Sequence, residues 1–152
     1  MKQAILTILF ILYTALILFL SFQPGEDTAD TSMRFTNFIL GLFIEGDIPY
    51  ETLVYWHMTF RLWAHPVIFC CYSILAMGVI TEFVRRRILC VVLSGISGIL
   101  LAVFTEVGKL NVPGRHFDME EMWLNVAGVV AGVIIYVVIA KLGNVLVKKN
   151  RE

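Results

Sequence analysis

Charged residues are scarce in this chain, and they are absent from four long stretches. Lys, Arg, Asp and Glu make up 16% of the 152 residues, whereas soluble domains average about 25%. Hydrophobic residues make up 59%, above the ~45–50% of an average soluble domain. The composition therefore disfavours a soluble domain. The 12 basic residues are matched by 12 acidic ones, so the chain has no basic excess to indicate a nucleic-acid partner.

Cysteine is also rare. The three cysteines, Cys70, Cys71 and Cys90, all lie in apolar stretches, and two of them are neighbours that are poorly placed to pair. We interpret all three as small buried hydrophobic residues rather than as a disulfide framework or a metal cluster. The chain shows no internal repeat, low-complexity tract or second domain, which predicts a single domain over residues 1–152.

The four stretches without charge each have nearly the ~20 residues that a helix needs to cross ~30 Å of hydrocarbon. They are Ala4–Phe22, Leu62–Thr81, Ile88–Thr105 and Met122–Ala140. They show no apolar–polar alternation, which favours helices over strands. We therefore predict an all-α, integral membrane four-helix bundle with helices at about 4–22, 62–83, 88–106 and 119–142. The first stretch is long for a signal peptide and has no suitable cleavage site after it, so we expect a retained helix.

The distribution of Lys and Arg predicts the orientation. Eight of the twelve basic residues fall on one side of the predicted spans: Lys2, Arg85, Arg86, Arg87, Lys141, Lys148, Lys149 and Arg151. We assign this side to the cytoplasm, which makes the protein multi-pass with both termini cytoplasmic. The outer side carries Arg34, Arg61, Lys109 and Arg115, together with most of the acidic residues.

Two segments then lie on the outer side. Within the longer one, residues 33–44 read MRFTNFILGLFI, too short to span and suited to an outer interfacial amphipathic helix. The shorter one contains the turn-prone pair Pro113-Gly114, and Asp118 followed by Glu121 resembles a capping box at the start of the last helix. His57, beside Tyr55 and Trp56, is interpreted as an ordinary interfacial loop residue.

Small residues at helical spacing predict helix contacts. Gly128 and Gly132 form a GxxxG pair in the last span, and Ser94 and Gly98 form a similar pair in the third.

Polar residues gather at the outer ends of the last three predicted spans. Arg61 and His65 are four residues apart and share a helix face. Asp118, Glu121 and Asn125 share a face of the last helix, and an amide in hydrocarbon needs a partner, which predicts that this face points into the bundle. Basic residues here are suited to a phosphate or carboxylate. His65, Glu106 and Asp118 are alternatively suited to acid–base catalysis, and a buried structural salt-bridge network is a third interpretation.

Other classes of site have less support. No HxxxH or HExxH spacing is present among the candidate ligands His65, Glu106, His116 and Asp118, so we expect neither a metal ion nor a cofactor. No span has an ionisable Asp, Glu, Lys or Arg near its centre, which disfavours an ion-coupled transporter.

Three groups of residues carry a resemblance to a known family. They are Ser21-Phe22-Gln23-Pro24-Gly25, then Arg61-Leu-Trp-Ala-His65-Pro66, then Glu106-Val-Gly-Lys109 with Pro113-Gly114-Arg115-His-Phe-Asp118 and Asn125-Val-Ala-Gly128. In order and spacing, from about Ser21 to Gly132, the chain resembles the VanZ-like family. That family is named for a protein that accompanies glycopeptide resistance genes and is linked to teicoplanin resistance. The resemblance implies a protein of the bacterial cell membrane that acts at the envelope.

The chain also departs from the family pattern. Ile68 and Phe69 stand where glutamate and tyrosine are often found, and Lys109 stands where glutamine is frequent. The positions that match the family pattern and the basic residues of the outer polar cluster together give the candidate ligand-binding residues. These are Gln23, Arg61, His65, Glu106, Lys109, Arg115, Asp118 and Asn125.

Three functional hypotheses follow. In the first, the outer polar site binds an anionic lipid headgroup or a lipid-linked cell-wall precursor, or a glycopeptide, and changes teicoplanin sensitivity. In the second, the protein is an enzyme acting on a lipid-linked or phospholipid substrate, with His65 or Glu106 as acid or base, Asp118 orienting it and Arg115 holding phosphate. In the third, the chain is a structural subunit that contacts a partner through its GxxxG face.

Overall fold

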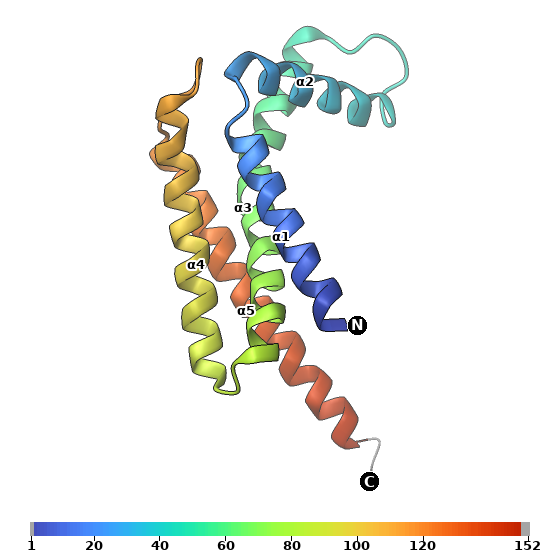
Figure 1. Ribbon diagram of the computed structural model, residues 1–152. Helices are drawn as coiled ribbons and strands as arrows, with labels where there is room; N and C mark the ends of the chain where they lie inside the picture. The colour runs from blue at the N-terminus through green and yellow to red at the C-terminus, as the bar shows by residue number, and fades with distance from the viewer. Residues whose placement is uncertain (1, 150–152) are drawn as a thin grey trace.

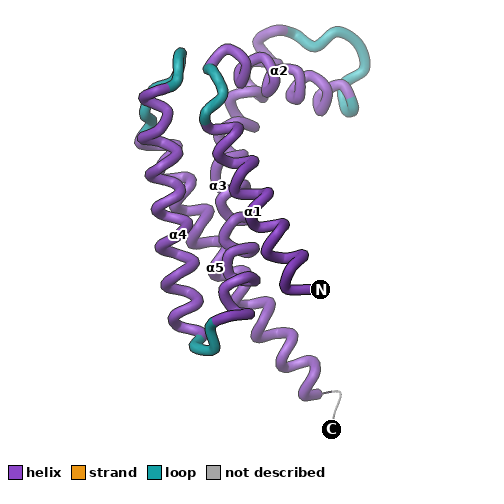
Figure 2. Tube along the Cα trace, viewed as in Figure 1, coloured by secondary structure: helices purple, strands orange, loops and turns teal. Residues whose placement is uncertain are grey.

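The computed structural model describes residues 2–149 and is helical throughout, apart from short connections (Figures 1 and 2). The elements in chain order are α1 (Lys2–Ser21), α2 (Gly25–Gly41), α3 (Tyr50–Phe83), α4 (Arg87–Gly108), the short 3-10 helix η1 (Lys109–Asn111) and α5 (Met119–Lys149). No strand occurs in residues 2–149. Helices α1, α3, α4 and α5 are long and apolar enough to cross a membrane. The predicted all-α bundle is therefore confirmed.

The four long helices run along one another, and α2 lies across one end of them (Figure 1). Helix α3 is central, because it packs against α1, α2, α4 and α5. The start of α1, the turn between α3 and α4 and the end of α5 all lie at the end opposite α2 (Figure 1). The turn at that end contains Arg85 and Arg86, which are part of the predicted cytoplasmic cluster of basic residues.

Helix α3 begins at Tyr50, twelve residues before the predicted start at Leu62. At 1.5 Å per residue its 34 residues extend about 51 Å, well beyond ~30 Å of hydrocarbon. The first three turns therefore continue past the apolar stretch and support α2. A search for charge-free residues stops at Arg61, so it detects the membrane-crossing part of a helix and misses its polar extension.

Helix α2 also begins earlier than predicted, at Gly25 instead of residue 33. Its first turn carries Glu26 and Asp27, which favour a helix N-terminus through the helix dipole. Thr36 and Leu40 are buried, whereas Phe38 is 64% exposed. Asp30 and Arg34 form an exposed ion pair of 3.0 Å, one and two turns before Phe38 on the exposed side of the helix. Apolar and charged side chains exposed on the same helix are typical of a helix in a membrane interface.

Both pairs of small residues mark helix contacts within the chain. A side chain at Gly128 would collide with the carbonyl oxygen of Pro66 in α3, and one at Gly132 would collide with that of Cys70. A Cβ atom at Gly98 in α4 would lie only 2.7 Å from Val129 in α5. The GxxxG face is therefore occupied by α3, which removes the surface that the structural-subunit hypothesis assigned to a partner.

The cysteines are only partly as predicted. Cys90 is buried and Cys70 is half-buried, but Cys71 is exposed on the surface of α3, so the prediction of burial is wrong for Cys71. All three are free thiols. Cys71 is the residue after Cys70, and the rotation between neighbouring residues of a helix turns its side chain away from α5.

Candidate ligand-binding site

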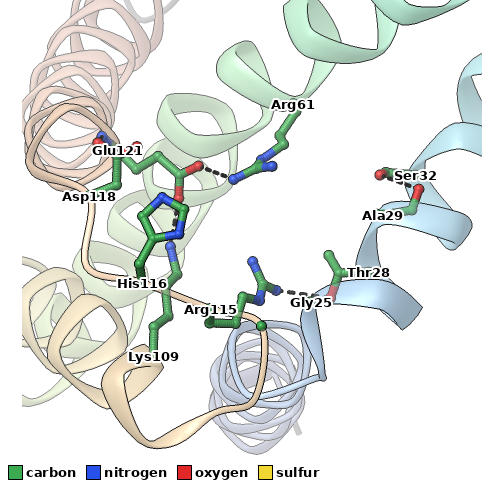
Figure 3. Close-up of a pocket in the computed structure, with 11 residues that line it drawn as sticks. Gly25, Thr28, Ala29, Ser32, Arg61, Lys109, Arg115, His116, Asp118 and Glu121 are labelled. Atoms are coloured by element: carbon green, nitrogen blue, oxygen red, sulfur yellow. Dashed lines mark hydrogen bonds and ion pairs between the residues drawn. The ribbon is translucent and has the colours of Figure 1, made fainter.

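Glu121, in the first turn of α5, is the centre of an ionic cluster at the α2 end of the bundle. Its Oε1 atom accepts a hydrogen bond of 2.6 Å from Arg61 Nη2 in α3. Its Oε2 atom accepts one of 2.6 Å from Lys109 Nζ in η1 and lies 3.3 Å from His65 Nε2. Figure 3 shows Arg61 and Lys109 approaching this carboxylate from different helices. One carboxylate thus joins α3, η1 and α5.

Lys109 lies between two carboxylates. Its Nζ atom also donates a hydrogen bond of 2.6 Å to Glu106 Oε1. Glu106 is 0% exposed, Lys109 3% and Glu121 7%. Charges buried to this degree are tolerated only when paired and hydrogen-bonded. The arrangement of one ammonium between two carboxylates meets this requirement.

His65 and Asn125 extend the cluster toward the centre of the bundle. Asn125 Nδ2 donates to Glu106 Oε1 at 3.4 Å, and Asn125 Oδ1 lies 3.0 Å from His65 Nδ1. Because an ionised carboxylate can only accept, the amide nitrogen must face Glu106 and the amide oxygen must face His65. In this arrangement His65 Nδ1 donates a hydrogen bond to Asn125 Oδ1. We call Arg61, His65, Glu106, Lys109, Glu121 and Asn125 the ionic cluster.

Arg115 stands beside this cluster, in the connection between η1 and α5. It donates hydrogen bonds to the backbone oxygens of Leu20 and Gln23, both at 3.3 Å, and to Thr28 Oγ1 at 2.9 Å. No carboxylate forms a salt bridge with Arg115 among the described residues. Burial lowers the pKa of Arg115, and the positive charge of Arg61 lowers it further. A guanidinium remains charged despite such a shift, so an anion beside Arg115 would be stabilised.

The connection that carries Arg115 is fixed by its own backbone. Gly114 has φ +71°, a left-handed conformation that glycine adopts without strain. The backbone N–H of Gly25 donates to the oxygen of Pro113 at 3.1 Å, and Gly25 packs directly against Gly114. The Pro113-Gly114 turn therefore attaches to the start of α2 and places Arg115 between α1, α2 and the cluster.

A cavity of about 540 Å³ lies beneath α2, between α3 and the adjoining ends of α1 and α4. Most of its wall is apolar and includes Ile17, Leu20, Phe35, Phe60 and Phe69. One part of the wall is polar and consists of Arg61, His65, Glu106, Lys109, Arg115 and Asn125. The cavity is therefore amphiphilic.

A smaller pocket of about 80 Å³ adjoins it. The larger cavity and this pocket share five lining residues: Thr28, Ser32, Arg61, Lys109 and Arg115. Figure 3 shows Arg61 and Arg115 on this pocket, with Thr28 and Ser32 of α2 across from them. The two arginines thus border both spaces.

Seven of the eight predicted ligand-binding residues line the larger cavity: Gln23, Arg61, His65, Glu106, Lys109, Arg115 and Asn125. Asp118 is the exception, and it lines only the smaller pocket. Its Oδ1 atom accepts hydrogen bonds from the backbone N–H groups of Glu120 at 2.8 Å and Glu121 at 3.3 Å. Asp118 is therefore the N-cap of α5, as its position before the last helix predicted. Its carboxylate makes no hydrogen bond to His65 or Glu106 in the described structure.

Two residues matter more than the sequence indicated. Glu121 was predicted to be a capping residue, but its carboxylate is used by Arg61 and Lys109. The sequence did contain a signal for this role, because Glu121 lies four residues before Asn125 on the helix side that was predicted to face inward. The interpretation of His57 as a loop residue is wrong, since it lies within α3, is 6% exposed, and has its Nε2 atom 2.7 Å from Ser32 Oγ in α2.

The residues placed closely enough to bind a metal ion differ from the candidate metal ligands considered from the sequence. His65, Glu106 and Glu121 each offer an atom within 4.8 Å of the others, whereas His116 and Asp118 take no part. The ammonium of Lys109 lies 2.6 Å from an oxygen of each carboxylate. It therefore supplies the positive charge that a cation would bring to this set.

Four apolar helices, an interfacial helix and an ionic cluster beside an amphiphilic cavity define a multi-pass membrane protein. The chain belongs to the VanZ/LLP1 family, whose sequence model matches residues 6–140. The match covers the cavity and every residue of the ionic cluster. No curated protein and no solved structure matches the chain.

The departures from the family pattern fall on the cavity wall. Ile68 and Phe69 both line the larger cavity, and Phe69 is buried. Apolar side chains at these two positions extend the apolar part of the wall next to His65. Lys109, the third departure, is the ammonium between Glu106 and Glu121.

Proposed function

We propose that this protein binds the anionic headgroup of a membrane lipid or a lipid-linked cell-wall precursor beside Arg61 and Arg115, in the outer leaflet of the bacterial cell membrane. The observation that carries the proposal is the amphiphilic cavity, whose apolar wall leads to these two arginines. A lipid has the same division into an apolar chain and a charged headgroup. The proposal places the α2 end outside and both termini in the cytoplasm.

The size and wall of the cavity support this function. Small-molecule pockets are usually ~300–1,000 Å³ and mostly apolar, with a few polar groups that fix orientation, and the cavity of about 540 Å³ fits this description. Its apolar wall is formed by α1, α2 and α3, the first two of which expose apolar side chains such as Leu20 and Phe35. A chain lying along this wall would replace lipid contacts rather than water contacts.

The two arginines supply the charge recognition. Arg61 uses Nη2 for Glu121 and keeps a side chain that is 42% exposed, so it retains free donors. Arg115 is held in place by two backbone oxygens and Thr28. Guanidinium groups bind phosphate through paired donors. Two such groups bordering one pocket can contact different oxygens of the same phosphate.

The family link connects this binding to antibiotic sensitivity. Glycopeptides act at the outer face of the membrane, where the proposed site lies. A protein that holds a lipid-linked precursor or an anionic lipid there would change how much of the glycopeptide target is accessible. Teicoplanin susceptibility would change with it. This step rests on the resemblance of the chain to the VanZ-like family.

The test compares arginine variants in binding and in cells. Arg61→Gln and Arg115→Gln remove the charges, whereas Arg34→Gln removes an exposed arginine of α2 that lines neither cavity. We expect the first two to lose binding of anionic lipid, measured by native mass spectrometry, and to reduce teicoplanin resistance in an expressing strain. Folded Arg61→Gln and Arg115→Gln proteins that match the Arg34→Gln control in both measurements would overturn the proposal.

One observation favours an enzymatic alternative. His65 lies in the cavity wall between Asn125 and the Glu121 carboxylate, and a histidine oriented in this way is suited to general acid–base catalysis. Asn125 and Glu121, rather than Asp118, would orient the ring. Incubation of the purified protein with lipid-linked precursors and phospholipids would distinguish the two functions, because only an enzyme forms product, and His65→Ala would abolish it.

A further inference from the structure

One oxygen of the buried Glu106 carboxylate has no hydrogen-bond partner. Glu106 Oε1 accepts from both Lys109 and Asn125, whereas Oε2 accepts from no group in the described structure. The residue is 0% exposed and belongs to the wall of the larger cavity. Buried carboxylate oxygens without a partner are rare, because leaving one unsatisfied costs about 1–3 kcal/mol or more. A donor placed in the cavity beside Glu106 would satisfy it.

The charges around the cavity restrict what this donor can be. Arg61, Lys109 and Arg115 bring three positive charges, and Glu106 and Glu121 bring two negative ones, so one positive charge is left over. Glu121 and Asp118 both line only the smaller pocket, but Glu121 is counted because it pairs with Arg61 and Lys109, whereas Asp118 forms no ion pair among the described residues and accepts from the backbone of α5. A ligand with one negative charge balances this excess. An ammonium group would add to the excess, so a neutral hydroxyl is the better donor.

We propose that the ligand is an amphiphile with a phosphodiester and a hydroxylated headgroup. The phosphodiester contacts Arg61 and Arg115, and a headgroup hydroxyl donates to Glu106. This inference rests on the proposed function and narrows the ligand class within it. It excludes zwitterionic headgroups and anionic headgroups that lack a hydroxyl as preferred ligands.

The test uses two lipids of equal charge. Phosphatidylglycerol has a phosphodiester and two hydroxyls, whereas phosphatidylethanol has the same phosphodiester and no hydroxyl. With matched acyl chains, the affinities of the full-length protein in detergent micelles are measured by native mass spectrometry. A hydrogen bond to a charged group is worth about tenfold or more in affinity, so we expect phosphatidylglycerol to bind about tenfold more tightly.

Two variants assign this preference to Glu106. Glu106→Gln removes the anionic acceptor, and the double variant Glu106→Met/Lys109→Met removes it without changing the net charge of the cluster. Both variants should bind phosphatidylglycerol and phosphatidylethanol with nearly equal affinity, whatever their overall affinity for anionic lipid. Glu120→Gln, an exposed neighbour of the cluster, is the matched control and should keep the tenfold preference.

The outcomes separate this inference from the proposed function. Equal wild-type affinity for phosphatidylglycerol and phosphatidylethanol, both above phosphatidylcholine, would overturn the hydroxyl contact and leave the anionic-lipid function in place. A preference that persists in both Glu106 variants would also overturn the contact. If neither anionic lipid bound better than phosphatidylcholine, the proposed function would fail as well. Glycerophosphoglycerol, the same headgroup without acyl chains, should bind far more weakly, and equal binding would contradict the role of the apolar wall.

Discussion

Lys109 and Glu121, twelve residues apart in the chain, form a buried ion pair of 2.6 Å that joins η1 to α5. The pair closes the loop between α4 and α5 and positions the turn that carries Arg115. Glu106 and Arg61 contact the two members from either side. This contact therefore links the segments that form the proposed site.

Glu121→Gln tests this link. The substitution removes the charge that faces Lys109, Arg61 and His65, and breaking one side of a buried ion pair costs about 3–5 kcal/mol. We expect a loss of unfolding free energy of that order, measured by chemical denaturation in lipid–detergent micelles. The matched control is Glu120→Gln, whose side chain is exposed. If the two variants were equally stable, the cluster would not hold the helices together.

The contact of α5 with α3 is tested by glycine substitutions. A Cβ atom at Gly128 would collide with the Pro66 backbone, and overpacking of this kind costs about 1–3 kcal/mol or more. A Cβ atom added at Gly95 in α4 would meet nothing within 4 Å, so Gly95→Ala should be neutral or stabilise by up to about 1 kcal/mol. Thermal unfolding of Gly128→Ala and Gly95→Ala compares them. Equal melting temperatures would contradict the close approach of α5 to α3.

The attachment of α2 is tested at Ser32. Its hydroxyl lies 2.7 Å from Nε2 of the buried His57, and removal of one partner of a buried hydrogen bond costs about 1–3 kcal/mol. Ser32→Ala should therefore accelerate amide hydrogen exchange across α2 and leave exchange in α4 unchanged. Asn37→Ala, on the exposed face of the same helix, is the control. Unchanged exchange in α2 after Ser32→Ala would show that the helix is held by other contacts.

The predicted orientation is tested by thiol labelling. In a background without Cys70, Cys71 and Cys90, we introduce Asp47→Cys in the connection from α2 to α3, or Arg86→Cys in the turn at the opposite end. The excess of basic residues at the latter end predicts a cytoplasmic location. A membrane-impermeant reagent should label Asp47→Cys in intact cells and Arg86→Cys only after permeabilisation. The reverse pattern would place the proposed site inside the cell.

The sequence predicted the spans well, because crossing hydrocarbon requires long stretches without charge. It predicted the starts of α2 and α3 poorly, because residues 25–32 and 50–61 are polar enough to resemble loops and form helices that pack on each other. Contacts such as Ser32 with His57 are set by tertiary packing, which hydropathy does not detect.

The candidate site was predicted in part for a related reason. Spacing of four placed Arg61 and His65 on one helix face, and spacing of three and four placed Glu121 and Asn125 on an inward-facing side of the last helix. The structure joins these two faces through Arg61 with Glu121 and His65 with Asn125. Spacing along one helix does not indicate which carboxylate meets a lysine from another segment. The central position of Glu121 follows from the path of residues 109–118, which no local pattern specifies, whereas the capping role of Asp118 was predicted from its place before the last helix.

The most direct test of the central claim is an experimental structure of the protein purified with native membrane lipid. We predict density for an apolar chain along Leu20, Phe35 and Phe60, ending in a phosphate between Arg61 and Arg115. A cavity closed by direct packing of α1 and α2 against α3, with both arginines turned away from each other, would contradict the proposed binding site.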